Sequence, residues 1–168
     1  MKNKDFYSKI LLFGEYSIIK NSSGLSIPFK KFNGTLKLND KLNGKAEASN
    51  LEIQKFYEYI KANINDLGRF NLQSLKEDIS NGLYFDSDIP KGFGVGSSGA
   101  LVAAIYDKYC DSDTDDLYEL KKTFSTMESY FHGNSSGLDP LVSFFNNPIF
   151  ISEGDVELLG DIKFLNSK

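Results

Sequence analysis

A glycine-rich segment, Pro90 to Ala100, constrains the fold of this chain more than any other stretch of its sequence. Its glycines are Gly92, Gly94, Gly96 and Gly99. Glycine adopts positive φ angles readily and lets a backbone approach a ligand without an intervening side chain. The apolar segment Ala100–Tyr109 follows directly, and its alanines favour a helix that is buried on every side. Because a glycine-rich turn that enters a helix presents unpaired amides at the positive end of the helix dipole, the sequence predicts an anion-binding loop.

Three other interpretations of this glycine segment compete with an anion-binding loop. A tight turn before a buried helix is the simplest, although four glycines exceed what a turn needs. Gly94–Gly99 fits the dinucleotide pattern G-x-G-x-x-G, but Pro90 precedes it and Glu119, twenty residues after Gly99, falls inside a predicted helix. A Walker loop would need Gly-Lys-Ser or Gly-Lys-Thr, and neither is present. A non-Walker phosphate loop is favoured, in which a hydroxyl of Ser97 or Ser98 could ligate Mg²⁺.

A second informative segment begins at Glu128, near the end of a helix predicted from Thr114. Apolar residues at helical spacing predict that helix, and they are Leu117, Leu120, Phe124, Met127 and Phe131. Glu128 lies beside this apolar face, so its carboxylate can point into a cleft, and His132 follows on the same side. A histidine in a last helical turn is often only a partner of the helix dipole. Residues 134–140 are predicted to form a polar turn that carries Asp139.

The order of predicted strands and helices along the rest of the sequence indicates an α+β fold in one domain spanning residues 1–168. Strands are predicted at 5–13, 16–19, 83–85, 149–152 and 162–165, with a further pair within 26–38 joined around Asn33-Gly34. The capping-box pattern Ser49-Asn-Leu-Glu52 predicts a helix start, and that helix continues through Asp66. Its apolar face is predicted to comprise Leu51, Phe56, Ile60 and Ile64. Strands and helices are mixed without strict alternation, which favours the α+β class.

Composition excludes several classes of partner. A net charge of −4 argues against a protein that coats nucleic acid, because phosphate contacts need a basic face. No stretch approaches the roughly 20 apolar residues of a membrane span, and the run Ile10–Phe13 is too short for a signal-peptide core. The single cysteine, Cys110, cannot form a disulfide within the chain, which is typical of a reducing compartment. We therefore expect a soluble, cytoplasmic protein with no nucleic-acid or membrane partner.

Three segments together resemble the GHMP kinases, and among them the mevalonate kinases most closely. They are Lys9-Ile-Leu-Leu-Phe-Gly-Glu15, Pro90-x-Gly-x-Gly-x-Gly-Ser-Ser98 and Glu128-x-x-x-His-Gly-Asn-x-Ser-Gly-x-Asp139, in the order found in that family. The resemblance covers roughly residues 5–150. It implies a fold like the family's N-terminal, ATP-binding lobe, with a mixed β-sheet packed against helices. The glycine segment is shared by all GHMP kinases, whereas the histidine-containing segment favours the mevalonate kinases.

The resemblance implies MgATP as the phosphate donor and assigns residues to it. The loop residues that would contact its phosphates are Gly92, Gly94, Gly96, Ser97 and Ser98. Ser98 and Glu128 would hold Mg²⁺. One hydroxyl and one carboxylate are ligands that this ion tolerates, because water and phosphate oxygens complete its coordination.

On the acceptor side, the resemblance implies Asp139 as the catalytic base with Lys9 beside it. An alcohol is a poor nucleophile near neutral pH, so a carboxylate takes its proton as the bond to phosphorus forms. A neighbouring ammonium stabilises the developing alkoxide and the charge on the γ-phosphoryl group. Glu15 and Ser136 would contact the substrate. The implied reaction phosphorylates (R)-mevalonate; the alternatives are another small alcohol, such as phosphomevalonate, a sugar or homoserine, or a non-catalytic nucleotide-binding or structural lobe.

The sequence also departs from the family pattern. Tyr16 stands where mevalonate kinases usually have histidine, and Ser135 stands where the family often has proline. The glycine-rich third motif of the family's C-terminal lobe does not follow Phe150. We therefore expect an N-terminal lobe that needs a C-terminal lobe as its partner and is inactive alone. The face that would pack on that lobe should be apolar, so self-association into a homodimer is also expected.

Overall fold

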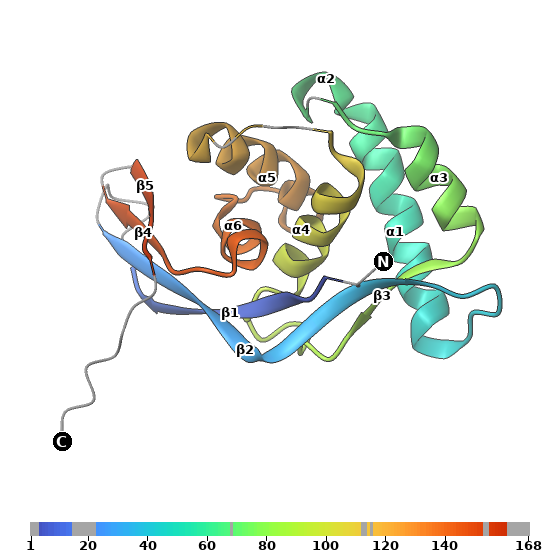
Figure 1. Ribbon diagram of the computed structural model, residues 1–168, viewed down its shortest axis with the longest axis horizontal. Coiled ribbons are helices and arrows are strands. Elements are labelled where there is room, and N and C mark those ends of the chain that lie inside the picture. The colour runs from blue at the N-terminus through green and yellow to red at the C-terminus, as the bar shows by residue number, and fades with distance from the viewer. Residues whose placement is uncertain are drawn as a thin grey trace.

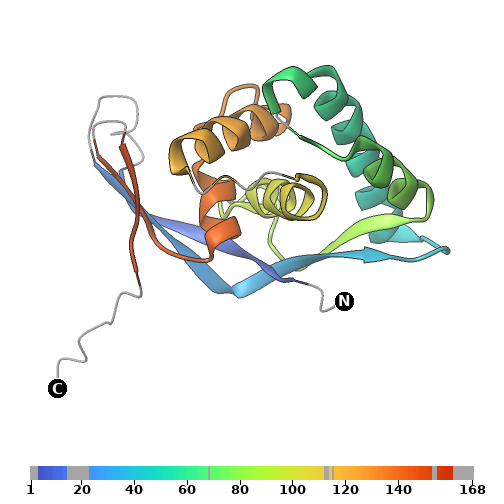
Figure 2. The same ribbon diagram turned by 45° about the horizontal axis from the view of Figure 1, so that its top comes forward.

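A computed structural model describes residues 4–14, 23–67, 69–111, 114, 116–152 and 155–160. Along the chain they form β1 (Phe6–Phe13), β2 (Gly24–Leu38), α1 (Gly44–Ala62), α2 (Ile64–Leu67), α3 (Leu72–Ser80), β3 (Leu83–Ser87), α4 (Ser97–Tyr109), α5 (Leu117–His132), α6 (Leu138–Phe145), β4 (Ile149–Ser152) and β5 (Asp155–Leu158). The strands form one five-stranded sheet with the helices on one side (Figures 1 and 2), which confirms the predicted α+β class. Glu15 and the predicted strands at 16–19 and 162–165 lie outside the described residues.

The long strand β2 organises the sheet. It pairs antiparallel with β1, β3 and β4, and β4 pairs antiparallel with β5. Every pairing among the described strands is therefore antiparallel, where a mixed sheet was expected. The backbone N–H of Lys9 in β1 donates to the carbonyl of Val95 at 2.9 Å, so this strand also holds the glycine loop.

The predicted pair of strands around Asn33-Gly34 is wrong, because β2 runs through both residues without a turn. Gly34 lies under the ring of Phe85, where a Cβ would stand 2.2 Å from the ring carbon Cζ. The backbone N–H of Asn33 donates to the carboxylate of Asp88 at 2.7 Å. This dipeptide, often a hairpin signal, here permits close packing against β3 and anchors the segment that leads to the glycine loop.

Helix α4 forms the centre of the helical layer (Figure 2). Its residues from Gly99 to Tyr106 are buried, which confirms the predicted buried helix, although it begins three residues earlier than expected, at Ser97. Helix α5 packs on the same core through Leu120, Phe124 and Met127, as its helical spacing predicted. None of the helices within the described ranges is both long and apolar enough to cross a bilayer.

The predicted capping box at Ser49 is wrong, because α1 begins at Gly44 and Ser49 lies inside the helix. The Ser49 hydroxyl instead accepts the backbone N–H of Phe85 at 2.9 Å and lies 3.3 Å from the Phe85 carbonyl. It therefore ties α1 to β3 rather than capping a helix. Leu51, predicted on the buried face, is 50% exposed, whereas Phe56 and Ile60 are buried as expected.

Two helices were not predicted from the sequence. Helix α3 begins after Asn71, whose side chain accepts the backbone N–H of Ser74 at 3.0 Å as an N-cap. Helix α6 begins at Leu138, so Asp139 lies in a first helical turn and not in the polar turn predicted for residues 134–140. That difference moves Asp139 onto a rigid element packed against α4.

Candidate functional site

Four elements bring charged and polar side chains together at the start of α4. Lys9 comes from β1, Ser98 from α4, Glu128 from α5 and Asp139 from α6. Lys9 Nζ lies 3.0 Å from Asp139 Oδ1, and the two side chains are 11% and 29% exposed. A pair this far from solvent is screened less than one on the surface. The structure therefore gathers the four residues to which the family resemblance assigned catalysis and metal binding.

Two glycines allow these elements to approach one another. A Cβ at Gly99 would lie 2.7 Å from the Cβ of Asp139, so α4 and α6 touch at this point. Gly96 has a φ of 80°, and a Cβ there would lie 2.8 Å from Cγ of Lys9. A larger residue at either position would move the Lys9–Asp139 pair. These glycines therefore shape the site as well as the loop.

The rest of the glycine loop is open. Gly92 and Gly94 have φ angles of 82° and 68°, and the space beside each is free of other described residues. Gly96 is the N-cap of α4 and has no side chain with which to bond the first amides of that helix. Those amides therefore lie open to an anion, with the hydroxyls of Ser97 and Ser98 beside them. The five predicted phosphate contacts thus lie together where anions are favoured.

Glu128 is a deeply buried carboxylate, 3% exposed. The Ser135 hydroxyl donates to its Oε2, and Ser98 Oγ lies 3.4 Å from its Oε1. Burial, and then the negative charge of Asp139, raise the pKa of Glu128 from its ordinary 4.5 to about 7. Hydrogen bonds and the positive charge of Lys9 act in the opposite direction. Because a metal ligand must be deprotonated, a cation at Glu128 would compete with its proton.

The oxygens of Ser98 and Glu128 fit Mg²⁺. Their separation of 3.4 Å is close to the about 3 Å between neighbouring ligands of an ion with bonds of about 2.1 Å. Mg²⁺ usually takes one or two protein oxygens and completes its shell with water and phosphate. Among the described residues there is no cluster of three or more histidine, cysteine or acidic side chains that could hold a metal unaided. The site therefore suits an ion that arrives with phosphate ligands.

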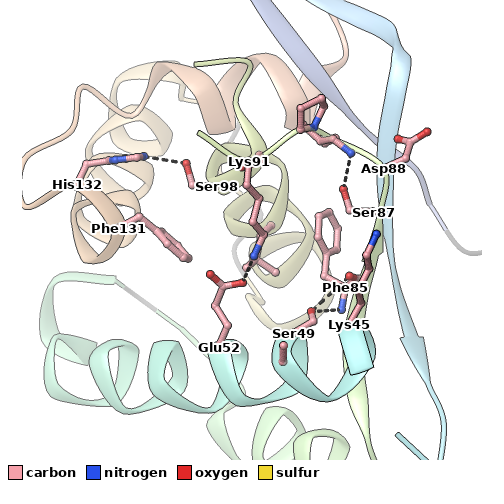
Figure 3. A pocket seen from close by; sticks show the side chains of 15 residues that line it. Lys45, Ser49, Glu52, Phe85, Ser87, Asp88, Lys91, Ser98, Phe131 and His132 are labelled. Atoms are coloured by element: carbon pink, nitrogen blue, oxygen red, sulfur yellow. Dashed lines mark hydrogen bonds and ion pairs between the residues drawn. The ribbon is translucent and has the colours of Figure 1, made fainter. Parts of the chain in front are cut away.

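A cavity of about 620 Å³ opens on the other side of Ser98 (Figure 3). Its apolar walls include Phe85, Leu101 and Phe131, from β3, α4 and α5. Figure 3 shows Lys91 reaching across from the glycine loop to α1, where its Nζ lies 2.8 Å from a carboxylate oxygen of Glu52. Pockets of this size and apolar character hold small organic ligands.

The structure also shows what the sequence did not single out. His132 was interpreted as a partner of the helix dipole, yet its Nε2 lies 2.9 Å from Ser98 Oγ. Ser135 was noted only as a departure from a family pattern, yet it bonds Glu128. The spacing of Glu128 and His132 by four residues was the available signal. Ser136, predicted to contact substrate, is exposed, and it forms no hydrogen bond within the described part of the chain.

The arrangement has the parts needed to move a phosphoryl group. A carboxylate next to an ammonium can take a proton from a hydroxyl, because the ammonium stabilises the anion that forms. The pair stands beside a helix N-terminus that favours phosphate, and beside two oxygens that suit a divalent ion.

Comparison with known proteins identifies the family. The family model for the GHMP kinases N terminal domain matches residues 53–147. Among solved structures, mevalonate kinase of Methanococcus jannaschii is 16% identical with a TM-score of 0.57, over 94% of this chain and 55% of that one. L. major mevalonate kinase in complex with R-mevalonate is 17% identical with a TM-score of 0.57, over 95% and 52%. Lactococcus lactis galactokinase complexed with galactose is 16% identical with a TM-score of 0.50, over 94% and 47%. A search of curated proteins gave no match.

Proposed function

This chain belongs to the GHMP kinase family, and from that premise we propose that it contributes to transfer of the γ-phosphate of MgATP to the hydroxyl of a small alcohol. The observation that carries the proposal is the Lys9–Asp139 pair, with Nζ and Oδ1 3.0 Å apart, beside Gly96 at the end of the glycine loop. A base and a cation next to a phosphate-binding helix start are the groups that phosphoryl transfer to an alcohol requires.

Asp139 is the proposed catalytic base, and Lys9 is its electrostatic partner. A carboxylate oxygen of Asp139 accepts the proton of the alcohol while the alcohol oxygen bonds to the γ-phosphorus. The bond from that phosphorus to the bridging oxygen of ATP breaks, and ADP leaves. Lys9 pairs with Asp139 and offers positive charge to the oxygens on which negative charge develops. Helix α6 and strand β1 hold the two side chains on rigid elements, which favours accurate positioning.

The phosphates are proposed to lie along the glycine loop, where amides of Gly92, Gly94 and Gly96 and the hydroxyls of Ser97 and Ser98 surround them. Ser98 and Glu128 are the proposed ligands of Mg²⁺. When bound, this ion neutralises phosphate charge and orients the γ-phosphoryl group.

The nucleoside is proposed to occupy the cavity between α1, α4 and α5. Its apolar walls suit a planar base, and the cavity adjoins Ser98, at the end of the loop. A nucleotide that runs from this cavity along the loop would bring its last phosphate toward Asp139. The two regions therefore fit one extended ligand.

The proposed acceptor is (R)-mevalonate, with 5-phosphomevalonate as product in the synthesis of isoprenoid precursors. Support comes from the His132–Asp139 segment and from likeness in fold to mevalonate kinases, one of them in complex with R-mevalonate. Likeness in fold to a galactokinase makes a sugar the natural competitor. Glu15 and Ser136 remain the proposed acceptor contacts.

A second lobe is proposed to complete the site. The chain spans only about half the length of these solved kinases, between 47% and 55%. Phosphoryl transfer depends on charges acting in a site from which water is excluded, and one lobe leaves the γ-phosphate facing solvent. The proposed setting is the cytoplasm, where MgATP is available.

The test is a coupled assay of ADP release with mevalonate, phosphomevalonate, homoserine and galactose as acceptors. It should be run on the chain alone and on the chain combined with a C-terminal lobe of the family. We expect release only with both lobes, and fastest with mevalonate. Preference for another acceptor would overturn the substrate, and ADP release by no combination would overturn the proposed function.

A further inference from the structure

Each of the two proposed cation ligands contacts one side chain that has no part in the reaction above. Ser98 Oγ lies 2.9 Å from His132 Nε2, and the Ser135 hydroxyl donates to Glu128 Oε2. His132 ends α5, and Ser135 follows in the turn that leads to α6. One short stretch of chain therefore contacts both ligands.

We propose that His132 and Ser135 are positioning residues: His132 accepts a hydrogen bond from the Ser98 hydroxyl, and Ser135 fixes Glu128. As a result, the lone pairs of Ser98 Oγ and Glu128 Oε1 face one point. The inference rests on the proposed function, since it concerns the same cation site. It adds two residues that act through the ligands without touching the ion.

The orientation of Ser98 depends on where its single proton goes. A serine hydroxyl has one proton and two lone pairs, and it can hold a cation only when the proton points elsewhere. Glu128 Oε1, at 3.4 Å, is a poor acceptor for that proton, while His132 Nε2 at 2.9 Å is well placed. In the tautomer that carries its proton on Nδ1, His132 accepts from Ser98. This leaves both Ser98 Oγ and Glu128 Oε1 free for a cation.

Ser135 fixes the other ligand. While its hydroxyl donates to Glu128 Oε2, the same oxygen accepts the backbone N–H of Gly137 at 3.1 Å. The backbone carbonyl of Ser135 accepts the hydroxyl of Ser125 on α5 at 2.6 Å. Ser135 is thus held from two sides, and it holds Oε2 so that Oε1 is turned toward Ser98. Outer partners that orient metal ligands commonly contribute about 10–100-fold in metal affinity.

The first test needs neither metal nor nucleotide. His132 is the single histidine of the sequence, so its imidazole signals in a long-range ¹H–¹⁵N NMR spectrum need no assignment. At a mildly alkaline pH, where imidazoles are neutral, we expect the proton on Nδ1 in the wild-type chain. Ser98→Ala should shift the population toward the proton on Nε2, and the neighbouring change Ser97→Ala should not. A wild-type proton on Nε2, or no response to Ser98→Ala, would overturn the role of His132.

The second test measures binding of Mn²⁺ in the presence of ADP, from the electron paramagnetic resonance signal of free Mn²⁺. His132→Phe and Ser135→Ala should weaken Mn²⁺ binding about 10–100-fold, and by more than they weaken the metal-free binding of ADP. His132→Gln keeps a side-chain acceptor and Ser135→Thr keeps a hydroxyl donor, so these variants should retain most of the Mn²⁺ affinity. Thermal unfolding of each variant checks that the fold is intact.

The outcomes separate the inference from the proposed function. If the wild-type chain binds ADP and Mn²⁺ and the variants bind them equally well, the positioning roles are wrong and the proposed function stands. An equal loss of ADP affinity with and without metal would also overturn the positioning roles, because it would indicate general damage to the site. If the wild-type chain binds no ADP, with or without Mn²⁺, even when it is combined with a C-terminal lobe of the family, the proposed function fails, and the tautomer of His132 still decides whether Ser98 is oriented as inferred.

Discussion

The two sides of the first turn of α4 differ in how deeply their charged groups are buried. On one side, Lys9 and Asp139 form an ion pair that is largely buried, next to Glu128 at 3% exposure. On the other side, the cavity has apolar walls, and its ion pair, Lys91 with Glu52, sits at the surface with Lys91 74% exposed. Ser98 lies at the boundary between them.

This difference indicates a division of labour. Charges buried together interact strongly because little water screens them, and chemistry on a hydroxyl and a phosphate requires such interactions. Apolar walls recognise a ligand by its shape and by the apolar surface that it buries, with little contribution from charge. If the division is real, changes on the polar side should have large effects on reactivity and on pH dependence, and changes at the cavity mouth should have small ones.

The largest effect is expected for Asp139→Asn. An amide cannot accept the proton of the alcohol, so turnover of the complete two-lobe enzyme should fall by about 10²–10⁴-fold. Affinity for nucleotide should stay within a few-fold, because the proposed phosphate contacts come from the loop. The measurement is kcat from ADP release, together with binding of ADP.

Asp86→Asn is the matched control for that change. Asp86 is an exposed carboxylate in β3 that pairs with Lys37 and lies outside the site. The turnover of the Asp86→Asn enzyme should match that of the wild type. Near-normal turnover of Asp139→Asn would mean that another group takes the proton.

Glu128 should make stability depend on pH. Its pKa is raised from 4.5 to about 7 in the folded chain, so between these values the folded state binds more protons than the unfolded state. The free energy of unfolding therefore falls as pH rises through this window. The loss of stability from this group is about 3–4 kcal/mol at most, because the window spans about 2.5 pH units at about 1.4 kcal/mol each. It is absent below about pH 4.5 and complete above about pH 7.

Glu128→Gln should remove this part of the pH dependence. Denaturant unfolding of both proteins across the window measures it, with Glu58→Gln at an exposed position of α1 as the control. The stability of the variant relative to the wild type should rise with pH. Parallel curves for the two proteins would show that the buried side does not hold its charges as described.

A smaller loss of stability is expected for Gly99→Ala. The added Cβ would stand 2.7 Å from the backbone carbon of Asp139, so α4 and α6 must separate slightly. Forcing atoms into a packed interface costs about 1–3 kcal/mol. Gly160→Ala, where the added atom meets no described residue within 4 Å, should change stability by less than about 0.5 kcal/mol. Equal unfolding midpoints for the two variants would show that α6 is not held tightly against α4.

The two sides also differ in how far the sequence predicted them. The glycine loop, the buried helix and the α5 face were predicted because local periodicity and glycine spacing carry the signal. The positions of Lys9, Ser98, Glu128 and Asp139 relative to one another came from a family resemblance. Their proximity depends on backbone contacts at Gly96 and Gly99, which no local pattern encodes.

The errors have a common physical cause. Ser49 and Gly34 carry strong local signals for a cap and a turn, but tertiary contacts with Phe85 decide their structure. The segment before Asp139 is polar and rich in glycine and serine, so it was assigned to a turn, and α6 was missed although its later residues are apolar. The cavity was not predicted at all, because its walls come from segments far apart in the sequence.

The smallest effect is expected at the mouth of the cavity, where Lys91 Nζ and Glu52 Oε2 are 2.8 Å apart. A double-mutant cycle of Lys91→Met and Glu52→Gln, measured by denaturant unfolding, should give a coupling of about 0.2–1 kcal/mol. An exposed pair gains little because water competes for both charges and two long side chains must be ordered. The coupling should vanish in about 1 M salt, where screening acts over about 3 Å. A coupling above about 2 kcal/mol that persists in salt would mean that this pair is rigidly held and poorly screened, as a buried pair is. In that case the cavity mouth would be a rigid part of the site, and the contrast between the two sides of α4 would fail.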